Sequence, residues 1–266
     1  MKRVSFLIAL GFGALAIWLL KPAEPKTLLE AVHDGQRIMF VGAHPDDELT
    51  VGAFLARAAE TTDVLVVCLT RGEGGRNRSG LDLGDSSIGE IRSEELRRSC
   101  ERLGVDVRIL DFSNGASPEI KAKIRSRDLP RETPEAVITR WQSSGRDPLA
   151  DLKTIIANWK PDILVSFETV QGFSNHPEHR AAGLLAARAA KEMGVGRVYA
   201  VFNRFAAQRN PRIPVLEANL ATDVIDGRET SLLTQKSYAD TALEALAEHV
   251  SQFGGPFMTP EKHALY

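Results

Sequence analysis

The sequence predicts an α/β protein: a three-layer sandwich with a mainly parallel, doubly wound, Rossmann-like sheet. Short apolar runs with the length of buried strands alternate along the 266 residues with segments that have the period of amphipathic helices. Glycine or proline stands where several of the helical segments end. The chain length suits one α/β domain, and strands that alternate with helices favour a parallel sheet covered on both faces.

The first predicted elements lie on either side of a short acidic turn. Residues 37–42 form an apolar run typical of a buried strand, and residues 47–60 form the helix that follows. Residues 63–70 repeat the strand pattern. A loop rich in Gly, Ser, Asn and Asp follows at residues 71–89 and leads into an amphipathic helix over residues 88–103, which a glycine ends.

The remaining elements continue the alternation. Residues 113–147 are polar and poorly periodic, and such long connections are usually functional or disordered. Residues 215–225 fit a further strand or an edge hairpin. Apolar runs and helical periods predict the other elements: strands at residues 107–112, 162–167 and 196–204, and helices at residues 148–159, 177–193 and 229–253.

The amino-terminal segment differs from the rest of the chain. After a basic start, residues 4–20 carry no charge and are almost entirely apolar, at the short end of the roughly 17–25 residues that a spanning helix needs. No convincing small-residue cleavage site follows. We therefore predict an uncleaved anchor at residues 1–21, with a cleaved signal peptide as the alternative. Residues 22–35 contain two prolines and are typical of a linker, and residues 36–266 form the main domain.

Charge and cysteine content narrow the class of protein. The formal net charge is −2, so nothing indicates a nucleic-acid partner. Cys68 and Cys100 lack the spacing of a metal site and form no disulfide framework, and the sequence does not decide whether they pair. The composition therefore favours neither a disulfide-stapled domain nor a nucleic-acid-binding protein.

Polar side chains are concentrated where the first predicted strand ends. Residues 43–48 read Ala-His-Pro-Asp-Asp-Glu, and four of them can bind a metal or move a proton: His44, Asp46, Asp47 and Glu48. Any one acid alone would be explained by the helix dipole. Their combination on one turn stiffened by a proline, where open α/β sheets bind ligands, indicates a site. Adjacent aspartates point different ways, so one can bind a metal while the other holds a water molecule.

A second cluster follows the fourth predicted strand. His176 and His179 are three residues apart, and Pro177 suits the first position of a helix. A His-x-x-His pair alone is a weak signal, since a histidine before a helix and a surface histidine one turn later give the same pattern. The fourth strand would lie near the first in a parallel sheet, so we expect the two clusters to meet around one metal ion.

Together, these motifs resemble the signatures of the LmbE-like (PIG-L) zinc de-N-acetylases. That family removes acetyl groups from N-acetylglucosamine units and related amino sugars. Residues 70–74 (Thr-Arg-Gly-Glu-Gly) are similar to its glycine/glutamate loop, and residues 91–96 (Ile-Arg-Ser-Glu-Glu-Leu) to its helical Arg-x-x-Glu segment. The similarity runs over residues 37–200 in the same order, and its first motif is the most specific.

The resemblance implies Zn²⁺ as the cofactor and assigns roles to individual residues. His44, Asp47 and His179 would be the zinc ligands. Asp46 would be the general base, and His176 would stabilise the oxyanion or protonate the leaving amine. Zinc in such a site lowers the pKa of bound water toward ~7, and Asp46 accepts the proton as hydroxide attacks the acetamide.

Two departures from the family pattern concern the second motif and the substrate contacts. The family usually has Asp where this chain has Glu178; the position is not a ligand in the pattern, so the metal site should survive. Asn114 stands at the substrate-binding Asp of a Pro-Asp-Gly segment, so the substrate can differ from that of better-known members. Arg92 falls at a substrate-contacting arginine, with an exposed helical ion pair to Glu94 or Glu95 as the alternative role.

These observations predict a zinc-dependent hydrolase that removes the N-acetyl group from an N-acetylglucosamine-type amino sugar in a glycan or glycolipid. The alternatives are a non-catalytic, membrane-tethered glycan-binding module of the same fold and a zinc amidohydrolase acting on a non-sugar amide. A dinucleotide-binding enzyme is disfavoured, because the first strand–helix turn lacks the G-x-G-x-x-G pattern. A phosphate-binding loop and a serine-hydrolase elbow are disfavoured because their motifs do not occur.

The amino-terminal segment also predicts where the protein acts. We expect membrane lipid as a partner of the single span, with the catalytic domain outside the cytoplasmic membrane. Secretion after signal cleavage and a cytosol-facing domain are the alternatives. An anchor would hold the site near a membrane-associated or envelope glycan and raise the effective substrate concentration.

Overall fold

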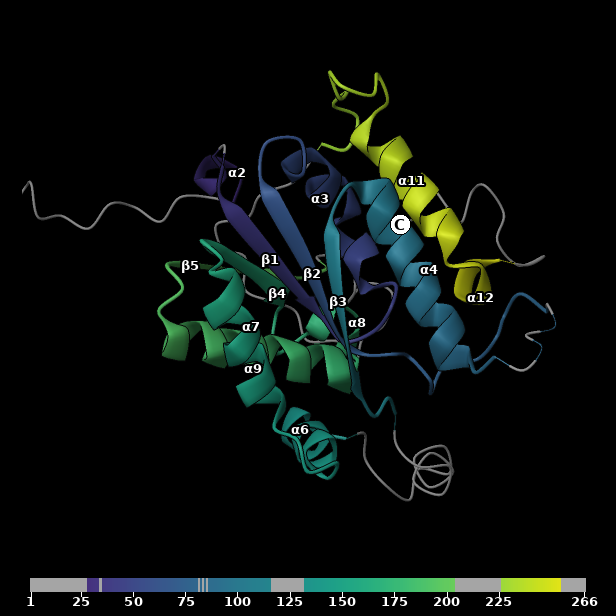
Figure 1. Ribbon diagram of the computed structural model, residues 1–266, viewed down its shortest axis with the longest axis vertical. Helices are drawn as coiled ribbons and strands as arrows, with labels where there is room; N and C mark the ends of the chain where they lie inside the picture. Colours follow the sequence, from purple (N-terminus) through teal and green to yellow (C-terminus); the bar gives the residue numbers. More distant parts are fainter. Residues whose placement is uncertain are drawn as a thin grey trace, which may run out of the picture.

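The computed structural model describes residues 28–33, 35–80, 82, 84, 86–115, 132–203 and 226–254. Within these residues, five parallel strands form one sheet in the order β3-β2-β1-β4-β5 (Figure 1). They are β1 (Arg37–Gly42), β2 (Asp63–Thr70), β3 (Asp106–Phe112), β4 (Ile163–Phe167) and β5 (Arg197–Val201). Because the chain winds outward in both directions from β1, this order confirms the predicted doubly wound α/β fold.

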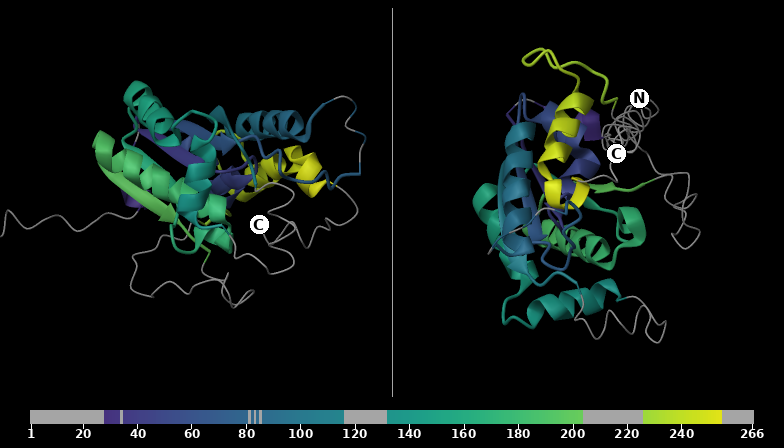
Figure 2. Two further views of the ribbon diagram at one scale, coloured as in Figure 1. Left: turned by 90° about the horizontal axis from the view of Figure 1, so that it is seen from below. Right: turned by 90° about the vertical axis from the view of Figure 1, so that its right-hand side faces the viewer.

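Helices cover both faces of this sheet, as Figures 1 and 2 show. The longer ones are α3 (Gly52–Ala58), α4 (Ile88–Leu103), α6 (Pro134–Gln142), α7 (Pro148–Trp159), α9 (Pro177–Met193) and α11 (Tyr238–Glu248). The short elements are α2 (Leu28–Ala31), the 3-10 helix η1 (Asp47–Val51), α8 (Gly172–Asn175) and α12 (Val250–Phe253).

Two apolar cores lie on opposite faces of the sheet. Met39 and Val41 of β1 face the core formed with α6, α7 and α9. The alternating residues Ile38 and Phe40 face the core formed with α3, α4 and α11. Strands buried on both faces need continuous apolar sequence, which explains why the strand runs are so easily recognised. The sheet therefore provides a rigid base for the loops at its carboxyl edge.

The long polar connection contains a helix that the sequence analysis missed. Within the predicted loop at residues 113–147, α6 begins at Pro134 after the cap Thr133, whose side chain accepts from Ala136 N. Val137 and Trp141 lie one turn apart on α6 and are fully buried. A capping threonine followed by a proline is a helix-start signal, so this helix was readable from the sequence.

The single carboxy-terminal helix predicted at residues 229–253 is wrong. Ser237 caps α11, which therefore begins at Tyr238, and residues 226–237 are irregular apart from a bridge between Thr230 and Ser237. His249 interrupts the helix with φ −82° and ψ 55°, and α12 follows it. The interruption matters for the site, because it is the position at which His249 is buried.

Smaller differences concern the ends of elements. The predicted helix at residues 47–60 is divided between η1 and α3 and ends at Ala58, and β4 and β5 are shorter than expected. Part of the predicted linker, residues 22–35, forms α2. Cys68 and Cys100 are buried free thiols, and burial raises the pKa of each.

Two predictions lie outside the described residues: the anchor at residues 1–21 and the strand or hairpin at residues 215–225. Among the helices that the structure describes, none has the length and apolar character needed to cross a bilayer.

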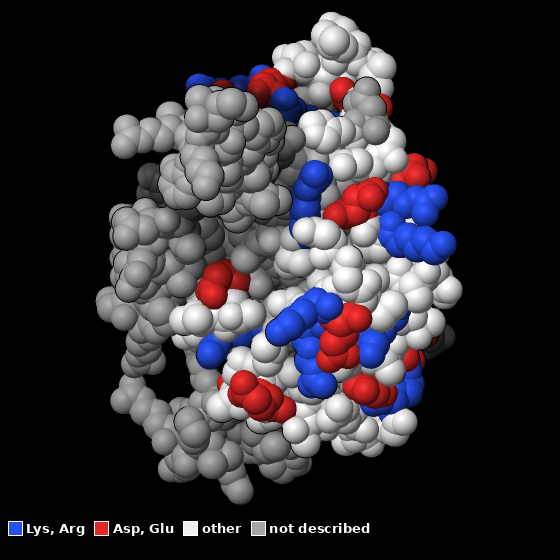
Figure 3. Space-filling view, turned by 90° about the vertical axis from the view of Figure 1, so that its left-hand side faces the viewer, with Lys and Arg blue, Asp and Glu red and all other residues white. Residues whose placement is uncertain are grey.

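Acidic and basic side chains are interspersed over the described part of the surface in Figure 3. Independently of this view, several charged side chains of the described residues form ion pairs between or within helices. Lys153 of α7 and Arg188 of α9, for example, both pair with Glu192, at 2.8 and 2.9 Å. Exposed pairs of this kind contribute about 0–1 kcal/mol each.

Candidate functional site

The two predicted clusters meet at the carboxyl edge of the sheet. β1 and β4 are hydrogen-bonded neighbours, and the loop after β1 carries His44 while the start of α9 carries His176 and His179. The ligand atoms of these three histidines all lie within 4.8 Å of one another. Sequence positions more than a hundred residues apart are therefore brought into one centre, as expected.

Hydrogen bonds fix the ring nitrogens of two of these histidines. His44 Nε2 lies 2.5 Å from Glu178 Oε2, and His179 Nδ1 lies 3.0 Å from the Gly172 carbonyl oxygen. Both partners only accept, so these nitrogens carry the protons. The opposite nitrogens, Nδ1 of His44 and Nε2 of His179, lie 3.2 Å apart. When both rings are neutral, each of these nitrogens has a lone pair; when His44 is protonated, its Nδ1 donates to His179 Nε2.

Asp47 completes this group of acceptors. Its Oδ1 lies 3.0 Å from His179 Nε2 and 3.8 Å from His44 Nδ1. Its Oδ2 accepts from the backbone N–H groups of Ala43 and His44, at 2.7 and 2.9 Å. Gly42 permits this approach, because a Cβ there would lie 2.9 Å from Asp47 Cβ.

These three atoms are suited to a cation. Two imidazole lone pairs and a carboxylate oxygen repel one another unless positive charge lies between them. Burial opposes ionisation of both groups, yet Asp47 and Glu178 raise the pKa of His44 to about 10, and the two histidines lower the pKa of Asp47 well below its usual range. Nitrogen and carboxylate donors of this kind suit Zn²⁺.

Asp46 has a partner of its own, separate from this group. Its Oδ2 accepts from Arg92 Nη2 at 3.0 Å, and its backbone has φ 112°, in the left-handed region. Burial raises the pKa of Asp46, although Arg92 opposes the rise. The adjacent aspartates therefore do point in different directions, as expected.

Arg92 is buried rather than exposed. Only 4% of it is accessible, and its guanidinium also donates to the carbonyl oxygens of Pro45 and Gly72. The alternative role as an exposed helical ion pair is wrong, because Glu94 pairs with Arg97 and Arg98 instead. The structure places Arg92 against the loop that carries Asp46.

His176 caps α9 and faces the other two histidines. Its ring centroid lies 4.8 Å from that of His44 and 5.0 Å from that of His179. Its Nδ1 accepts from Glu178 N at 3.3 Å, which leaves the proton of the neutral ring on Nε2. Burial and the neighbouring histidines lower the pKa of His176 to about 3, so the ring is neutral at physiological pH.

Glu178 is the buried hub that the sequence analysis left without a role. Its Oε2 accepts from His44 Nε2 and Asn114 Nδ2, both at 2.5 Å. Its Oε1 accepts from Gly115 N at 2.7 Å and from Arg140 Nη2 at 2.6 Å. A carboxylate that accepts from the distal nitrogen of a metal-binding histidine orients the ring and raises its basicity. The Asp-to-Glu departure therefore leaves a carboxylate bonded to His44.

Arg140 and Asn114 join further segments to this hub. Arg140 lies on the unpredicted α6 and also binds Glu132, with Nε to Oε1 at 3.1 Å. Asn114 Oδ1 accepts from Gly74 N at 2.8 Å, and its backbone N–H donates to Glu73 at 2.7 Å. Because Asn114 faces Glu178, the structure shows it as part of the support around His44.

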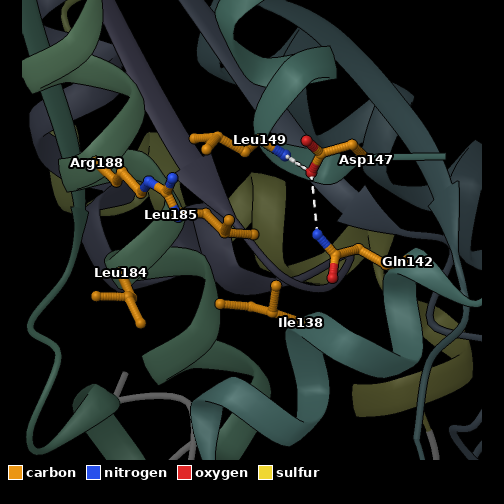
Figure 4. A pocket seen from close by; sticks show the side chains of 7 residues that line it. All are labelled: Ile138, Gln142, Asp147, Leu149, Leu184, Leu185 and Arg188. Atoms are coloured by element: carbon orange, nitrogen blue, oxygen red, sulfur yellow. Dashed lines mark hydrogen bonds between the residues drawn. The ribbon is translucent and has the colours of Figure 1, made fainter.

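Two of the cavities among the described residues lie beside α6 and α9. One, of about 230 Å³, is enclosed by Ile138, Leu184 and Leu185, with Gln142, Asp147, Leu149 and Arg188 completing its walls (Figure 4). It contains none of the clustered histidines. The other, of about 270 Å³, is lined by both neighbours of His176, which are Asn175 and Pro177, and by four charged or polar side chains and a proline, Glu132, Thr133, Pro134, Glu135 and Arg180. None of the three histidines lines the second cavity either, but Asn175 and Pro177, on either side of His176 in the sequence, do.

The family model named PIG-L, GlcNAc-PI de-N-acetylase, matches residues 39–190, which is more than half of the chain. The chain belongs to the PIG-L family. The predicted membership is thus confirmed, and the matched range contains both histidine clusters and Glu178.

Relatives of this PIG-L chain are named as deacetylases. One from Thermomonospora curvata, named 1D-myo-inositol 2-acetamido-2-deoxy-alpha-D-glucopyranoside deacetylase, is 27% identical over 256 residues that cover 84% of each chain. A deacetylase of the same name, numbered 2, from Frankia alni is 28% identical over 252 residues, covering 80% of this chain and 83% of the relative.

Solved structures of deacetylases share the fold. The A40926 pseudoaglycone deacetylase Dbv21 has a TM-score of 0.59 at 20% identity, covering 86% of this chain and 87% of its own. The N,N'-diacetylchitobiose deacetylase of Pyrococcus horikoshii has a TM-score of 0.50 at 19% identity, covering 86% and 73%.

Proposed function

We propose that this PIG-L family chain is a zinc-dependent hydrolase that removes the N-acetyl group from an N-acetylglucosamine-type amino sugar. The observation that carries the proposal is the convergence of two imidazole lone pairs and one carboxylate oxygen beside a second, separately held carboxylate. His44, Asp47 and His179 would hold the metal, and Asp46 remains free to move protons. This division matches the needs of a hydrolytic site, which combines three protein ligands with a base that is not a ligand.

When bound, zinc at such a site supplies Lewis acidity, which polarises a carbonyl oxygen and lowers the pKa of water. The rest of the chemistry falls to the side chains of the chain. Asp46 accepts the proton of the attacking water, and its burial raises its pKa toward the range of an effective base. The same carboxyl group can return that proton to the amide nitrogen, which must be protonated before it leaves as an amine.

His176 would stabilise the oxyanion in this scheme by donating a hydrogen bond to it. The neutral ring carries its proton on Nε2, because Nδ1 accepts from Glu178 N. With a pKa of about 3, His176 has no second proton to give the leaving amine at neutral pH. Hydrogen-bond donation to the developing negative charge is therefore its role, and such a donor typically contributes about 10²–10³-fold in rate.

The cavity beside His176 is the proposed seat of the sugar. Its volume of about 270 Å³ and its lining by Glu132, Thr133 and Arg180 suit a ring that presents hydroxyl groups. The named substrates of the relatives, an inositol-linked acetamido sugar and diacetylchitobiose, support the same class. Asn114 and Arg92 remain proposed substrate contacts. A bound sugar would compete with Glu178 and Gly74 for the side chain of Asn114, and with Asp46 for the guanidinium of Arg92.

An amine-release screen tests the proposal. Purified, zinc-loaded protein is offered N-acetylglucosaminyl lipids, N-acetylated oligosaccharides and simple acetylated peptides, and acetate and free amine are measured. We expect turnover of acetylated sugars. Turnover of acetyl-peptides without any sugar activity would overturn the sugar assignment, and binding of sugars without acetate release would favour a glycan-binding module.

The anchor at residues 1–21 is a separate proposal, supported by the apolar, uncharged run at residues 4–20. We propose a single span with the domain outside the cytoplasmic membrane. Protease added to intact spheroplasts should digest the domain, and full protection would refute the outward orientation.

A further inference from the structure

We propose that His249, at the junction of α11 and α12, is a positioning residue that acts through Glu48 to hold the backbone of Asp46 in its left-handed conformation. The inference rests on the proposed role of Asp46 as the general base. It extends the site to a segment more than fifty residues beyond the end of the range matched by the family model.

A continuous chain of contacts links the two residues. His249 Nε2 lies 2.6 Å from Glu48 Oε1, and both side chains are fully buried. The other oxygen of the same carboxylate, Oε2, accepts from Asp46 N at 3.1 Å. Ser99 Oγ also donates to Oε1, at 2.6 Å. Glu48 is thus held from one side and itself holds the amide of Asp46.

The left-handed backbone of Asp46 requires stabilising contacts. A left-handed backbone is unfavourable for a residue other than glycine and persists only when its surroundings impose it. Arg92 fixes the carboxylate of Asp46, and Glu48 fixes its N–H. The two contacts together determine where the Asp46 carboxylate points relative to the histidine cluster.

The chemistry of His249 argues against a purely structural role. Its Nδ1 has no hydrogen-bond partner among the described residues, so the bond to Glu48 is the ring's one polar contact there. A buried ring with an unpaired nitrogen is less favourable for stability than an apolar side chain of similar size. Burial opposes protonation of the ring, yet Glu48 raises the pKa of His249, so the ring donates a hydrogen bond to Glu48.

The same segment offers a matched control. Ser251 attaches α12 to α4 through Glu95, with its N–H and Oγ both donating at 2.6 Å. Ser251→Ala removes one of these anchoring bonds and leaves Glu48 untouched. If α12 only needed to be attached, losing the Ser251 bond and losing the His249 bond would have similar effects on activity.

The experiment compares His249→Leu, His249→Gln and Ser251→Ala in the full chain, with thermal stability, zinc content, kcat and KM measured for acetate release from an N-acetylated amino sugar. In His249→Leu we expect kcat to fall at least ~10-fold, because a misplacement on the order of 1 Å can cost 10²-fold. Zinc content and KM should match wild type. His249→Gln places an amide N–H near the position of Nε2 and should recover most of the loss, and Ser251→Ala should keep wild-type kcat.

A double variant and a crystal structure complete the test. Because His249 acts through Glu48, adding His249→Leu to Glu48→Ala should cost no further activity, and independent losses that multiply would overturn the inference. An unchanged kcat in His249→Leu, or a crystal structure of it with Asp46 in the wild-type conformation, would also overturn it. If wild-type protein released no acetate from any probe, the proposed function would fail, while the crystal structure would still decide whether His249 positions Asp46.

Discussion

Replacing Glu178 by Gln should weaken zinc binding while preserving the shape of the site. Each oxygen of Glu178 accepts from two donors: His44 and Asn114 on one, Gly115 and Arg140 on the other. A glutamine places an NH₂ group at one of these oxygens. Whichever way the amide turns, two donors then lose their acceptor.

The magnitude follows from these contacts. Hydrogen bonds to a charged group contribute about 1.5–3 kcal/mol each, so losing two costs the metal-free protein roughly 3–6 kcal/mol of unfolding free energy. When the lost pair includes the Glu178–His44 bond, the ring loses the partner that fixes its tautomer. Loss of such a partner typically lowers metal affinity or activity 10–100-fold. We therefore expect the zinc affinity of Glu178→Gln to be lower than that of wild type by about this factor.

The assay is zinc affinity measured by competition with a chelator, together with thermal unfolding of the metal-free protein. Glu132→Gln is the matched control, because Glu132 shares the partner Arg140 but does not contact His44. It should lower stability and leave zinc affinity unchanged. Glu178→Asp keeps a carboxylate and should retain zinc affinity within about tenfold. Wild-type zinc affinity in Glu178→Gln would refute the reasoning.

Three further predictions concern the rest of the site. Asp46→Asn should retain zinc but lose at least ~10²-fold in turnover, the usual scale for a general base. Asp47→Asn should lose the metal. Equal loss of metal in both variants would contradict this division of roles. Zinc affinity should rise by roughly tenfold per pH unit between about pH 6 and pH 8, because His44, with a metal-free pKa of about 10, must release a proton to bind a cation. Chelator competition at several pH values measures this dependence, and an affinity that does not change with pH would exclude it. Gly72→Ala should reduce turnover and lower the unfolding temperature, because the added Cβ would clash with Arg92 Nη1 and because residue 72 has a φ of +69°. Turnover and an unfolding temperature equal to those of wild type would show that the Arg92 contact is dispensable.

The sequence was most informative where local signals and burial agree. β1 and β2 are apolar along their length because both faces of the sheet are covered, and α4, α7 and α9 have the predicted bounds. Each of these helices starts after a serine, aspartate or histidine cap and ends at a left-handed residue, Gly104, Lys160 or Gly194. The meeting of the two histidine clusters followed from the adjacency of β1 and β4.

The parts that were missed depend on contacts between distant segments. The contacts of Glu178 with Arg140 and of Glu48 with His249 join residues 38 and 201 positions apart. No local period or cap reports such pairs, since they exist only once the strand order is set. Arg92 illustrates the same limit: the helical pattern left its exposure undecided, and packing against the loop of Asp46 decided it.

The most direct test of the account is zinc content and acetate release measured on the same samples of wild-type protein and of His44→Ala, Asp47→Ala and His179→Ala. The account predicts a single zinc ion per wild-type chain and acetate release from an N-acetylated amino sugar, with both reduced in each variant. Stoichiometric zinc in all three variants would contradict it, because the convergence of these three side chains would then not be the metal centre.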